Sequence, residues 1–298
     1  MLETDHFLDI DDVTTDELQT ILDRAAAIKS GADDARLPER TMGMLFEKPS
    51  TRTRISFETG MTQLGGHAVF LGPDDIQLGH GEPLSDTSRV LSRYVDVVMA
   101  RLFSHDDLVE IADYADVPVV NGLTDDAHPC QTLADLLTIK EQFGGFDGVR
   151  AAWVGDGNNV GQSFVVGAAM AGLDLTVATP PDYGMSDECV EQAAELGHEP
   201  TIVDAPEEAV SDADVVYTDV WISMGQESER HEKLQAFEGY QVNEDLLSGT
   251  DAKVMHCLPA HRGEEISHDV LESDRALVWD QAENRLHAQK GLLVELLE

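Results

Sequence analysis

The sequence predicts an α/β protein with two domains, each a mainly parallel sheet flanked by helices. The first observation behind this prediction is length, since 298 residues exceed the size at which one hydrophobic core keeps growing. The second is order: short apolar segments of strand type alternate with segments of helical periodicity, which is typical of parallel sheets.

The first half of the chain contains four strand-like segments, at residues 42–46, 68–71, 95–100 and 118–121. Apolar residues three and four positions apart predict helices at 15–29, 51–64 and 129–143. In the second of these helices the pattern predicts one buried face, made of Ile55, Phe57, Met61 and Leu64.

The second half contains six strand-like segments, at residues 151–155, 173–178, 201–203, 215–219, 253–257 and 276–279. A helix is predicted at 160–171, and a last helix from about 282 to 297 is expected to pack on the first domain. The glycine-rich stretch 144–148 indicates the junction. We expect one domain of residues 1–135 with the C-terminal helix 282–298, and a second domain of residues 136–281.

The charge balance limits the possible partners. The chain has 58 Asp and Glu residues against 19 Lys and Arg, a formal net charge of −39. Such a surface repels nucleic acid and anionic membranes, so neither is expected as a partner. A hydrophobic fraction of 42% contradicts a disordered acidic protein. The composition resembles that of halophile proteins, whose carboxylates keep the chain hydrated in molar salt.

The N-terminus and the cysteines predict a cytoplasmic location. Residues 1–5 are acidic and precede no apolar core of a signal peptide, and no apolar run approaches the ~18 residues that cross a bilayer. Cys130, Cys189 and Cys257 leave an odd count and form no C-x-x-C pair. Neither a disulfide framework nor a zinc ribbon is indicated, and a reducing compartment fits.

A phosphate-binding turn is predicted at Ser50-Thr51-Arg52-Thr53-Arg54, between an apolar strand and a helix. The free N–H groups and the positive dipole at the start of a helix favour an anion. The hydroxyls of Ser50, Thr51 and Thr53 and the guanidinium of Arg52 add donors for its oxygens. A plain helix cap with solvated arginines is the alternative. Two arginines in one turn favour the phosphate in a chain this poor in cations.

Two further groups lie where ligands of open α/β sheets bind. Arg101 ends an apolar strand and can hold a phosphate or polarise a carbonyl, although an ion pair is the alternative. His128-Pro129-Cys130-Gln131 opens another helix with proline at its first position. His128 can donate to a carbonyl oxygen on which charge develops, and Gln131 to an amide group; simple capping is the alternative.

In the second half, the turn from Gly155 to Gly161 follows a strand and opens a helix, as in a dinucleotide-binding fold. Its spacing is G-x-G-x-x-x-G, and the next strand ends without an acid for a ribose. We therefore favour a turn that presents Asn159 to a substrate. Asp219 ends another strand and can anchor a substrate ammonium beneath a loop that closes over it, although an acidic turn is the alternative.

The segment from His256 to His261 places Cys257 at a further strand end. His256, Cys257 and His261 suggest a metal, but no other ligand cluster completes a tetrahedral site, so we predict no metal. A buried inert thiol is the alternative for Cys257.

Four motifs now occur in one order: Ser50-Thr51-Arg52-Thr53-Arg54, His128-Pro129-Cys130-Gln131, Asp219 with Ser223-Met224-Gly225, and His256-Cys257-Leu258-Pro259. Over essentially its whole length the chain resembles the ornithine carbamoyltransferases, within the aspartate/ornithine carbamoyltransferase superfamily. The first motif marks the superfamily. The loop at Ser223 and the cysteine at 257 point to ornithine.

The resemblance implies carbamoyl phosphate and L-ornithine as substrates, which react to L-citrulline and phosphate. It implies an active site between the two domains. The implied carbamoyl-phosphate site is Ser50, Thr51, Arg52, Thr53, Gln77, Arg101, His128, Gln131, Cys257, Leu258 and Arg285, with Gln77 donated across a subunit interface. The implied ornithine site is Asn159, Asp219, Ser223 and Met224. The implied catalytic residues are Arg101, His128, Asp219 and Cys257. Family members are built on a homotrimer, so self-association as a trimer or its multiples is expected.

The residue chemistry agrees with carbamoyl transfer. An alkyl ammonium of pKa ~10 must lose a proton before it attacks, and Asp219 and Cys257 are the candidates that tune that proton. Arg101, His128 and Thr53 can stabilise the oxyanion that forms. This chemistry requires no metal or redox cofactor. The alternatives are a carbamoyltransferase for another amine such as putrescine, a dinucleotide-dependent oxidoreductase, and a non-catalytic phosphometabolite sensor.

Overall fold

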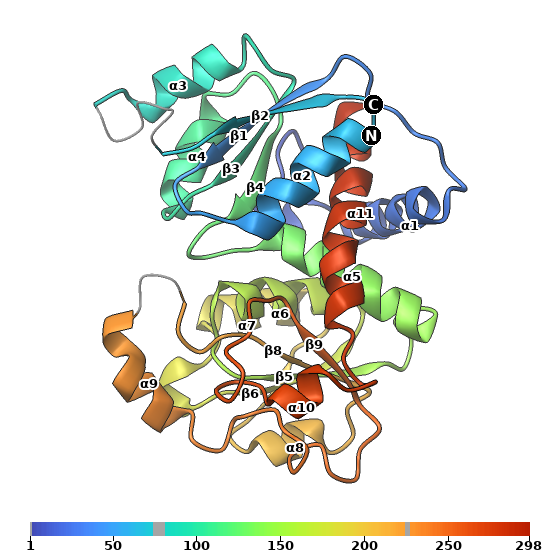
Figure 1. Ribbon diagram of the computed structural model, residues 1–298, viewed down its shortest axis with the longest axis vertical. Helices are drawn as coiled ribbons and strands as arrows, with labels where there is room; N and C mark the ends of the chain where they lie inside the picture. Colours follow the sequence, from blue (N-terminus) through green and yellow to red (C-terminus); the bar gives the residue numbers. More distant parts are fainter. Residues whose placement is uncertain (1, 74–80, 224–226) are drawn as a thin grey trace. The chain divides into compact units, whose positions relative to one another are not determined.

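The computed structural model describes residues 2–73, 81–223 and 227–298. The chain divides into two compact units, Met1–Leu137 with Glu283–Glu298 and Thr138–Ala282. Each unit contains one parallel sheet flanked by helices, which confirms the predicted two-domain α/β fold (Figure 1). The divisions fall inside two helices, α5 (Pro129–Phe143) and α11 (Val278–Leu297), and the glycine-rich stretch 144–148 follows α5.

The sheet of the first unit has four parallel strands in the order β2-β1-β3-β4. They are β1 (Thr41–Phe46), β2 (His67–Leu71), β3 (Val97–Arg101) and β4 (Val119–Leu123), and they confirm the four strands predicted in the first half. Every residue of β3 is buried, as is every residue of β1 after Thr41, which is typical of strands covered on both faces. β2 lies at the edge and is partly exposed.

Helices of the first unit surround this sheet. They are η1 (Ile10–Asp12), α1 (Thr15–Ser30), α2 (Thr51–Gln63), α3 (Leu84–Leu91), α4 (His105–Asp113), and the parts of α5 and α11 named above. α1 begins in a capping box of Thr14 and Glu17. α11 packs closely on α1, because a Cβ added at Gly291 would lie 2.7 Å from the carbonyl oxygen of Ile21.

The predicted buried face of α2 was wrong at one residue. Phe57, Met61 and Leu64 are buried, but Ile55 is 56% exposed. A residue two positions before Phe57 lies about 200° away around a helix, on the opposite side. The buried stripe is completed instead by Thr53 and by Gly60, against which α11 packs.

The second unit has five parallel strands in the order β7-β6-β5-β8-β9. They are β5 (Arg150–Val154), β6 (Asp174–Ala178), β7 (Thr201–Val203), β8 (Val215–Thr218) and β9 (Lys253–His256). Its helices are α6 (Asn159–Ala171), η2 (Pro181–Tyr183), α7 (Asp187–Glu195), α8 (Pro206–Val210), η3 (Glu227–Glu229), α9 (Arg230–Ala236) and α10 (His268–Leu271). From β5 the chain continues to β6 and β7 on one side of the sheet, and then to β8 and β9 on the other side. Ligands of such sheets bind at the carboxyl ends of the strands, beside the point where the two directions meet.

The sixth strand predicted in this half, at 276–279, was wrong. Ala276 forms only an isolated bridge to Val254, and α11 already begins at Val278, four residues before the predicted start. A run of four apolar residues is too short for its periodicity to separate a strand from the first turn of a helix.

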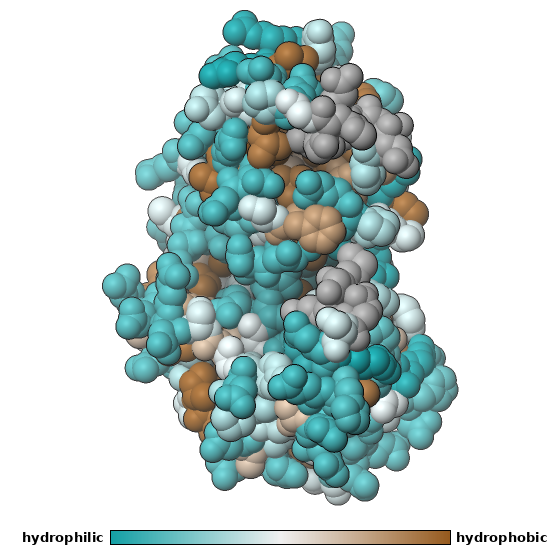
Figure 2. Space-filling model, turned by 90° about the vertical axis from the view of Figure 1, so that its left-hand side faces the viewer, coloured by the Kyte–Doolittle hydropathy of each residue, from teal (hydrophilic) through white to brown (hydrophobic). Residues whose placement is uncertain are grey.

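Hydrophilic residues dominate the face in Figure 2, with small groups of hydrophobic residues between them. None of the helices in the described residues is both long and apolar enough to cross a membrane.

Candidate active site

The phosphate-binding turn predicted at 50–54 forms the start of α2. Ser50 is the N-cap, and its hydroxyl accepts a hydrogen bond from the backbone N–H of Thr53 at 3.3 Å. Thr53 is buried, Arg52 is half-buried, and Arg54 is exposed and pairs with Glu58. The turn therefore combines a helix N-terminus, hydroxyls and one partly enclosed guanidinium.

Arg101 and Arg285 converge on the same hydroxyl. Arg101 is the last residue of β3 and is only 7% exposed, and its Nη1 donates to Oγ1 of Thr53 at 3.4 Å. Arg285, on α11, donates from Nη2 to the same atom at 3.4 Å. The register between β3 and β4 shifts at Arg101, which turns this side chain at the end of the strand. Two buried guanidiniums thus flank the start of α2.

Arg285 also organises the motif at the start of α5. Its Nη1 donates to Oε1 of Gln131 at 2.7 Å and lies 3.5 Å from Nε2 of His128. The amide nitrogen of Gln131 donates to Oδ1 of Asp135 at 2.8 Å, which fixes the orientation of the amide. Gln289 accepts from Nε of Arg285 at 3.1 Å. Asp135 and Gln289, which the sequence analysis missed, hold the predicted residues in place.

The electrostatics of this cluster suit an anion. Burial lowers the pKa of His128 well below its ordinary value, and the nearby guanidiniums of Arg285, Arg101 and Arg52 lower it further. The ring is therefore neutral at physiological pH and carries a single N–H. Three arginines near one histidine, in a chain of net charge −39, form a positively charged cluster that suits an anion such as a phosphate.

Lys48 links the loops that carry this cluster and was also missed from the sequence. Its side chain is 4% exposed, forms an ion pair with Asp125, and lies over the ring of Phe103 at 4.2 Å. Lys48 precedes the turn at Ser50, Phe103 follows Arg101, and Asp125 precedes His128. The only sequence signal was a lysine two positions before Ser50.

A second group of predicted residues lies at the carboxyl ends of β8 and β9. Asp219 follows β8 and is 5% exposed. Its Oδ1 accepts from the thiol of Cys257 at 2.9 Å, and its Oδ2 accepts from the side-chain amide of Asn158 at 2.9 Å. Asn158 is also the N-cap of α6 and accepts from the N–H groups of Val160 and Gly161. Asn159 was the residue predicted at this turn, and the residue that contacts Asp219 is its neighbour Asn158.

The backbone after β9 has an unusual geometry. Nδ1 of His256 accepts from the N–H of Leu258 at 2.9 Å, so the ring carries its proton on Nε2, 3.0 Å from the buried carboxylate of Glu265. Leu258 has φ +59, a left-handed conformation that is rare for a leucine, and the bond to Pro259 is cis. Residues held in such conformations often lie at functional sites.

Ligand-type side chains gather twice in the described residues: Asp219 with His256 and Cys257, and His261 with Glu264 and Glu265, each within 4.8 Å. His261 therefore belongs to a different group from His256 and Cys257. In the first group the thiol already donates to Asp219, and both ring nitrogens of His256 are hydrogen-bonded. The arrangement is better suited to holding protons than to coordinating a metal.

The glycine turn after β5 does not leave room for a pyrophosphate. A Cβ added at Gly157 would lie 2.3 Å from the carbonyl oxygen of Gly184, and the N–H of Gly157 donates to Tyr183. These glycines allow one part of the chain to pack on another, whereas a dinucleotide fingerprint leaves the backbone open to the cofactor. The geometry contradicts the dinucleotide alternative.

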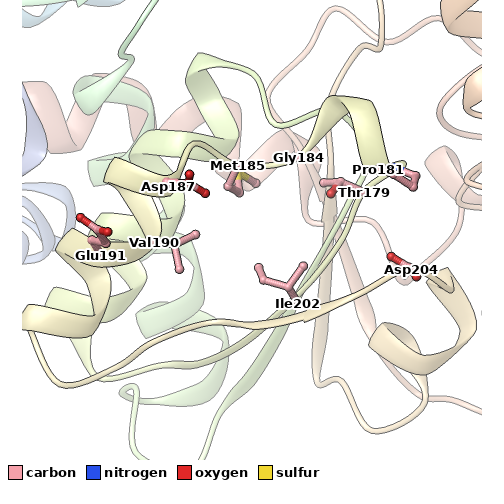
Figure 3. A pocket seen from close by; sticks show the side chains of 9 residues that line it. All are labelled: Thr179, Pro181, Gly184, Met185, Asp187, Val190, Glu191, Ile202 and Asp204. Atoms are coloured by element: carbon pink, nitrogen blue, oxygen red, sulfur yellow. The ribbon is translucent and has the colours of Figure 1, made fainter.

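The other predicted residues are distributed as follows. Asn159 is the first residue of α6, Ser223 ends the described part of the loop after β8, and Thr51 is the first residue of α2. Gln77 and Met224 lie outside the described residues. A cavity of about 410 Å³ at the ends of β6 and β7 is lined by none of the predicted site residues (Figure 3).

Two family models match this chain, and together they cover both groups of predicted site residues. Residues 5–141 match the family model described as "Aspartate/ornithine carbamoyltransferase, carbamoyl-P binding domain", and residues 147–296 match the corresponding "Asp/Orn binding domain". The first match contains Arg52, Arg101 and His128, and the second contains Arg285, Asp219 and Cys257.

Individual relatives cover the whole chain. An ornithine carbamoyltransferase from Haloquadratum walsbyi is 78% identical over 100% of this chain and 99% of its own length. One from Methanoculleus marisnigri is 55% identical, over 98% and 96% of the two chains. The solved structure of the Pyrococcus furiosus ornithine carbamoyltransferase matches with a TM-score of 0.94 and 48% identity, over 100% and 98%. The resemblance predicted from the motifs is confirmed, and the chain belongs to the aspartate/ornithine carbamoyltransferase family.

Proposed function

We propose that this protein transfers the carbamoyl group of carbamoyl phosphate to the side-chain amine of L-ornithine, giving L-citrulline and phosphate. The observation that carries the proposal is the convergence of Arg101 and Arg285 on Thr53 at the start of α2, beside Arg52. Neutral His128, at the start of α5, lies 3.5 Å from Arg285. The full-length relatives named ornithine carbamoyltransferase support the same reaction.

The first unit would bind the donor and the second the acceptor, and we propose the two units as the functional domains. The phosphate would meet the start of α2 and Arg52, while Arg101, His128 and Gln131 face the carbamoyl group. The complete proposed donor set is Ser50, Thr51, Arg52, Thr53, Gln77, Arg101, His128, Gln131, Cys257, Leu258 and Arg285. The proposed acceptor set is Asn159, Asp219, Ser223 and Met224, and Asn158 joins it as the residue that orients Asp219.

The transfer itself is an attack of the neutral amine on the carbamoyl carbon. The C–N bond forms, the carbonyl oxygen becomes an oxyanion, and the bond from carbon to the phosphate oxygen then breaks. Arg101, the single N–H of His128 and Thr53 stabilise the oxyanion, because hydrogen-bond donors held ready in a dry site lower the barrier. The amine proton passes to a carboxylate or to the departing phosphate. Asp219, held by Asn158 and Cys257, is the group that orients the ammonium.

Citrulline formation in molar KCl is the direct test of this function. The purified protein should form citrulline from carbamoyl phosphate and ornithine, and Arg52→Ala should lose most of this activity while keeping its circular dichroism spectrum. A folded Arg52→Ala variant with full activity would refute the role of Arg52. Binding of carbamoyl phosphate without turnover would favour the phosphometabolite sensor.

The choice of acceptor is tested by comparing ornithine with putrescine, which lacks the α-carboxylate. We expect kcat/KM to be higher for ornithine by at least two orders of magnitude, because a site built for a polar group strongly rejects an analogue without it. A preference for putrescine would instead support the carbamoyltransferase for another amine.

We also propose a homotrimer, or a multiple of it, that works in the cytoplasm. The first unit exposes several large apolar side chains, among them Ile55 at 56%, Val69 at 38% and Tyr94 at 76%, and β2 is an edge strand. Exposed apolar groups beside a free strand edge favour self-association. Cys130, Cys189 and Cys257 form no disulfide within the described residues, which suits a reducing compartment. Light scattering after size exclusion in molar salt would give the mass of the assembly.

A further inference from the structure

An enclosed ion pair in the second unit takes no part in the proposed transfer. Nζ of Lys233 lies 2.6 Å from Oδ2 of Asp156, and the two side chains are only 4% and 9% exposed. Burial raises the pKa of Asp156 above its ordinary value, and Lys233 opposes that shift. Enclosing two opposite charges is seldom a net gain in stability, so a buried pair is better explained by the geometry that it specifies.

Asp156 belongs to the same turn as Asn158, the residue that orients Asp219. The turn joins β5 to α6. A hydrogen bond from Nε1 of Trp153 to the carbonyl oxygen of Asp156, at 3.1 Å, holds the turn in place. Asn158 donates to Asp219 at 2.9 Å and lies 3.5 Å from the carbonyl oxygen of Val220. We call residues 219–223 the acceptor segment. The turn thus contacts the acceptor segment through Asn158 and α9 through Asp156.

α9 returns to the acceptor segment through an aromatic contact. Phe237, which caps the C-terminal end of α9, stacks on Trp221 with ring centroids 5.1 Å apart and an interplanar angle of 20°. Lys233 and Phe237 are four positions apart, so they share one face of the helix. Tyr183 fills the space between them, 5.4 Å from Nζ of Lys233 and 5.1 Å from the ring of Phe237. The contacts form a closed ring: the turn contacts the acceptor segment, the acceptor segment contacts α9, and α9 contacts the turn.

We propose that the ion pair of Lys233 and Asp156 positions the acceptor site: it fixes α9 against the β5–α6 turn and thereby sets where Asp219 meets the acceptor amine. Lys233 is a positioning residue and touches no substrate. The inference rests on the proposed function, in which that amine belongs to ornithine.

The variant Lys233→Met keeps the apolar stem and removes the charge. We expect KM for ornithine to rise about tenfold, because small misplacements of a binding group have large kinetic effects. The Kd of carbamoyl phosphate should stay within twofold, since most of its proposed ligands belong to the first unit and only Cys257 and Leu258 belong to the second. Lys233→Arg, which restores a cation, should recover most of the ornithine affinity. An unchanged KM for ornithine, or equal losses for both substrates, would overturn the proposal.

A double variant separates positioning from folding. Lys233→Met alone leaves Asp156 buried without its partner, whereas Lys233→Met with Asp156→Asn removes both charges. A double variant with the melting temperature of the wild type and a raised KM for ornithine supports the positioning role. A double variant with wild-type melting temperature and wild-type KM contradicts it. A wild-type protein that binds carbamoyl phosphate but forms no citrulline would contradict the proposed function, and this inference with it.

Lys253→Met is the matched control in the same unit. Lys253 lies at the start of β9 and its Nζ donates to the carbonyl oxygen of Asp274 at 3.0 Å. The control should leave both substrate constants unchanged. The effect of Lys233→Met should persist between 0.5 and 3 M KCl, because salt screens buried pairs much less than exposed ones. Loss of the effect in high salt would contradict a buried positioning contact.

Discussion

At the scale of single residues, Arg285 connects what we call the donor cluster, which consists of Thr53, Arg101, His128 and Gln131. Its guanidinium contacts Thr53 from α2, Gln131 from α5 and Gln289 from its own helix. A guanidinium suits this position because it remains charged and presents several donors in a rigid plane. One side chain can therefore hold three neighbours and still face an anion.

Replacing Arg285 by Met should reduce kcat/KM for carbamoyl phosphate by about 100-fold or more, which is typical of removing one donor from a developing negative charge. Steady-state kinetics with carbamoyl phosphate as the varied substrate measure this. Arg150→Met is the control, because Arg150 is an exposed arginine of the second unit that pairs with Asp214. Similar losses in the two variants would show that the effect is one of general charge.

His128 links the donor site to the pH dependence of stability. Its pKa in the folded protein is held below the ordinary value by burial and by Arg285, Arg101 and Arg52. As the pH falls through about 6.5, a histidine in the unfolded chain takes up a proton while His128 in the folded protein does not. The folded state therefore loses stability towards acid pH, by about 1.4 kcal/mol per pH unit while the two states differ by one proton.

The free energy of unfolding should consequently fall more steeply between pH 6.5 and 5 for the wild type than for His128→Asn, which has no ring to protonate. Urea unfolding at several pH values, in constant salt, gives both slopes. Parallel curves for the two proteins would mean that the pKa of His128 is not lowered in the folded state.

At the scale of elements, most of the proposed site residues lie at the ends of helices and strands. The donor cluster gathers at the starts of α2 and α5 and at the end of β3, and Asp219 and Cys257 follow β8 and β9. Asn158 shows how a local feature acquires a second role. Its oxygen caps α6 while its amide nitrogen holds Asp219, so one side chain serves both the helix and the proposed acceptor site.

Asn158→Ala should therefore cause two separable losses. We expect about 1 kcal/mol of stability to be lost with the cap. KM for ornithine should also rise by about tenfold, because the carboxylate of Asp219 loses a hydrogen bond worth about 1.5 kcal/mol together with its orientation. Thermal unfolding and steady-state kinetics measure the two effects.

Ser186→Ala is the matched control for this prediction. Ser186 is the N-cap of α7 in the same unit, and its hydroxyl accepts from the N–H of Cys189 at 3.2 Å. The control should lose a similar amount of stability and leave KM for ornithine unchanged. A raised KM in both variants would assign the kinetic effect to loosened folding.

At the scale of the whole molecule, the charge of −39 dominates solution behaviour. Repulsion among exposed carboxylates destabilises a compact state, and salt shortens its range from about 10 Å at 0.1 M to about 3 Å at 1 M. We expect the melting temperature to rise by at least 10 °C between 0.1 and 3 M KCl. Differential scanning calorimetry measures it.

The matched variant for this effect carries amides in place of several exposed carboxylates, for example Asp187→Asn and Glu191→Gln on α7. Its melting temperature should depend less on KCl than that of the wild type. A wild-type melting temperature that is independent of salt would contradict the electrostatic account.

The sequence alone determined the alternation of strands and helices, the two-domain α/β fold and the family. These follow from local patterns: buried strands read as apolar runs, and Ser50 and Pro129 mark helix starts by their own chemistry. The motifs at 50–54, 128–131 and 256–259 were recognisable because the spacing of their residues along the chain is itself the signal. Local patterning failed at Ile55 and at 276–279, where too few residues defined the period.

Only the tertiary structure decided which side chains meet. Arg285 and Thr53 are 232 positions apart, and Lys233 and Asp156 are 77 apart, so no local pattern predicts either contact. The contact between Asn158 and Asp219 depended on where β8 ends beside β5, and the packing of Gly157 against Gly184 excluded a dinucleotide that the spacing alone only disfavoured. Sequence spacing specifies elements because they form from neighbours, whereas a site forms from side chains that folding brings together.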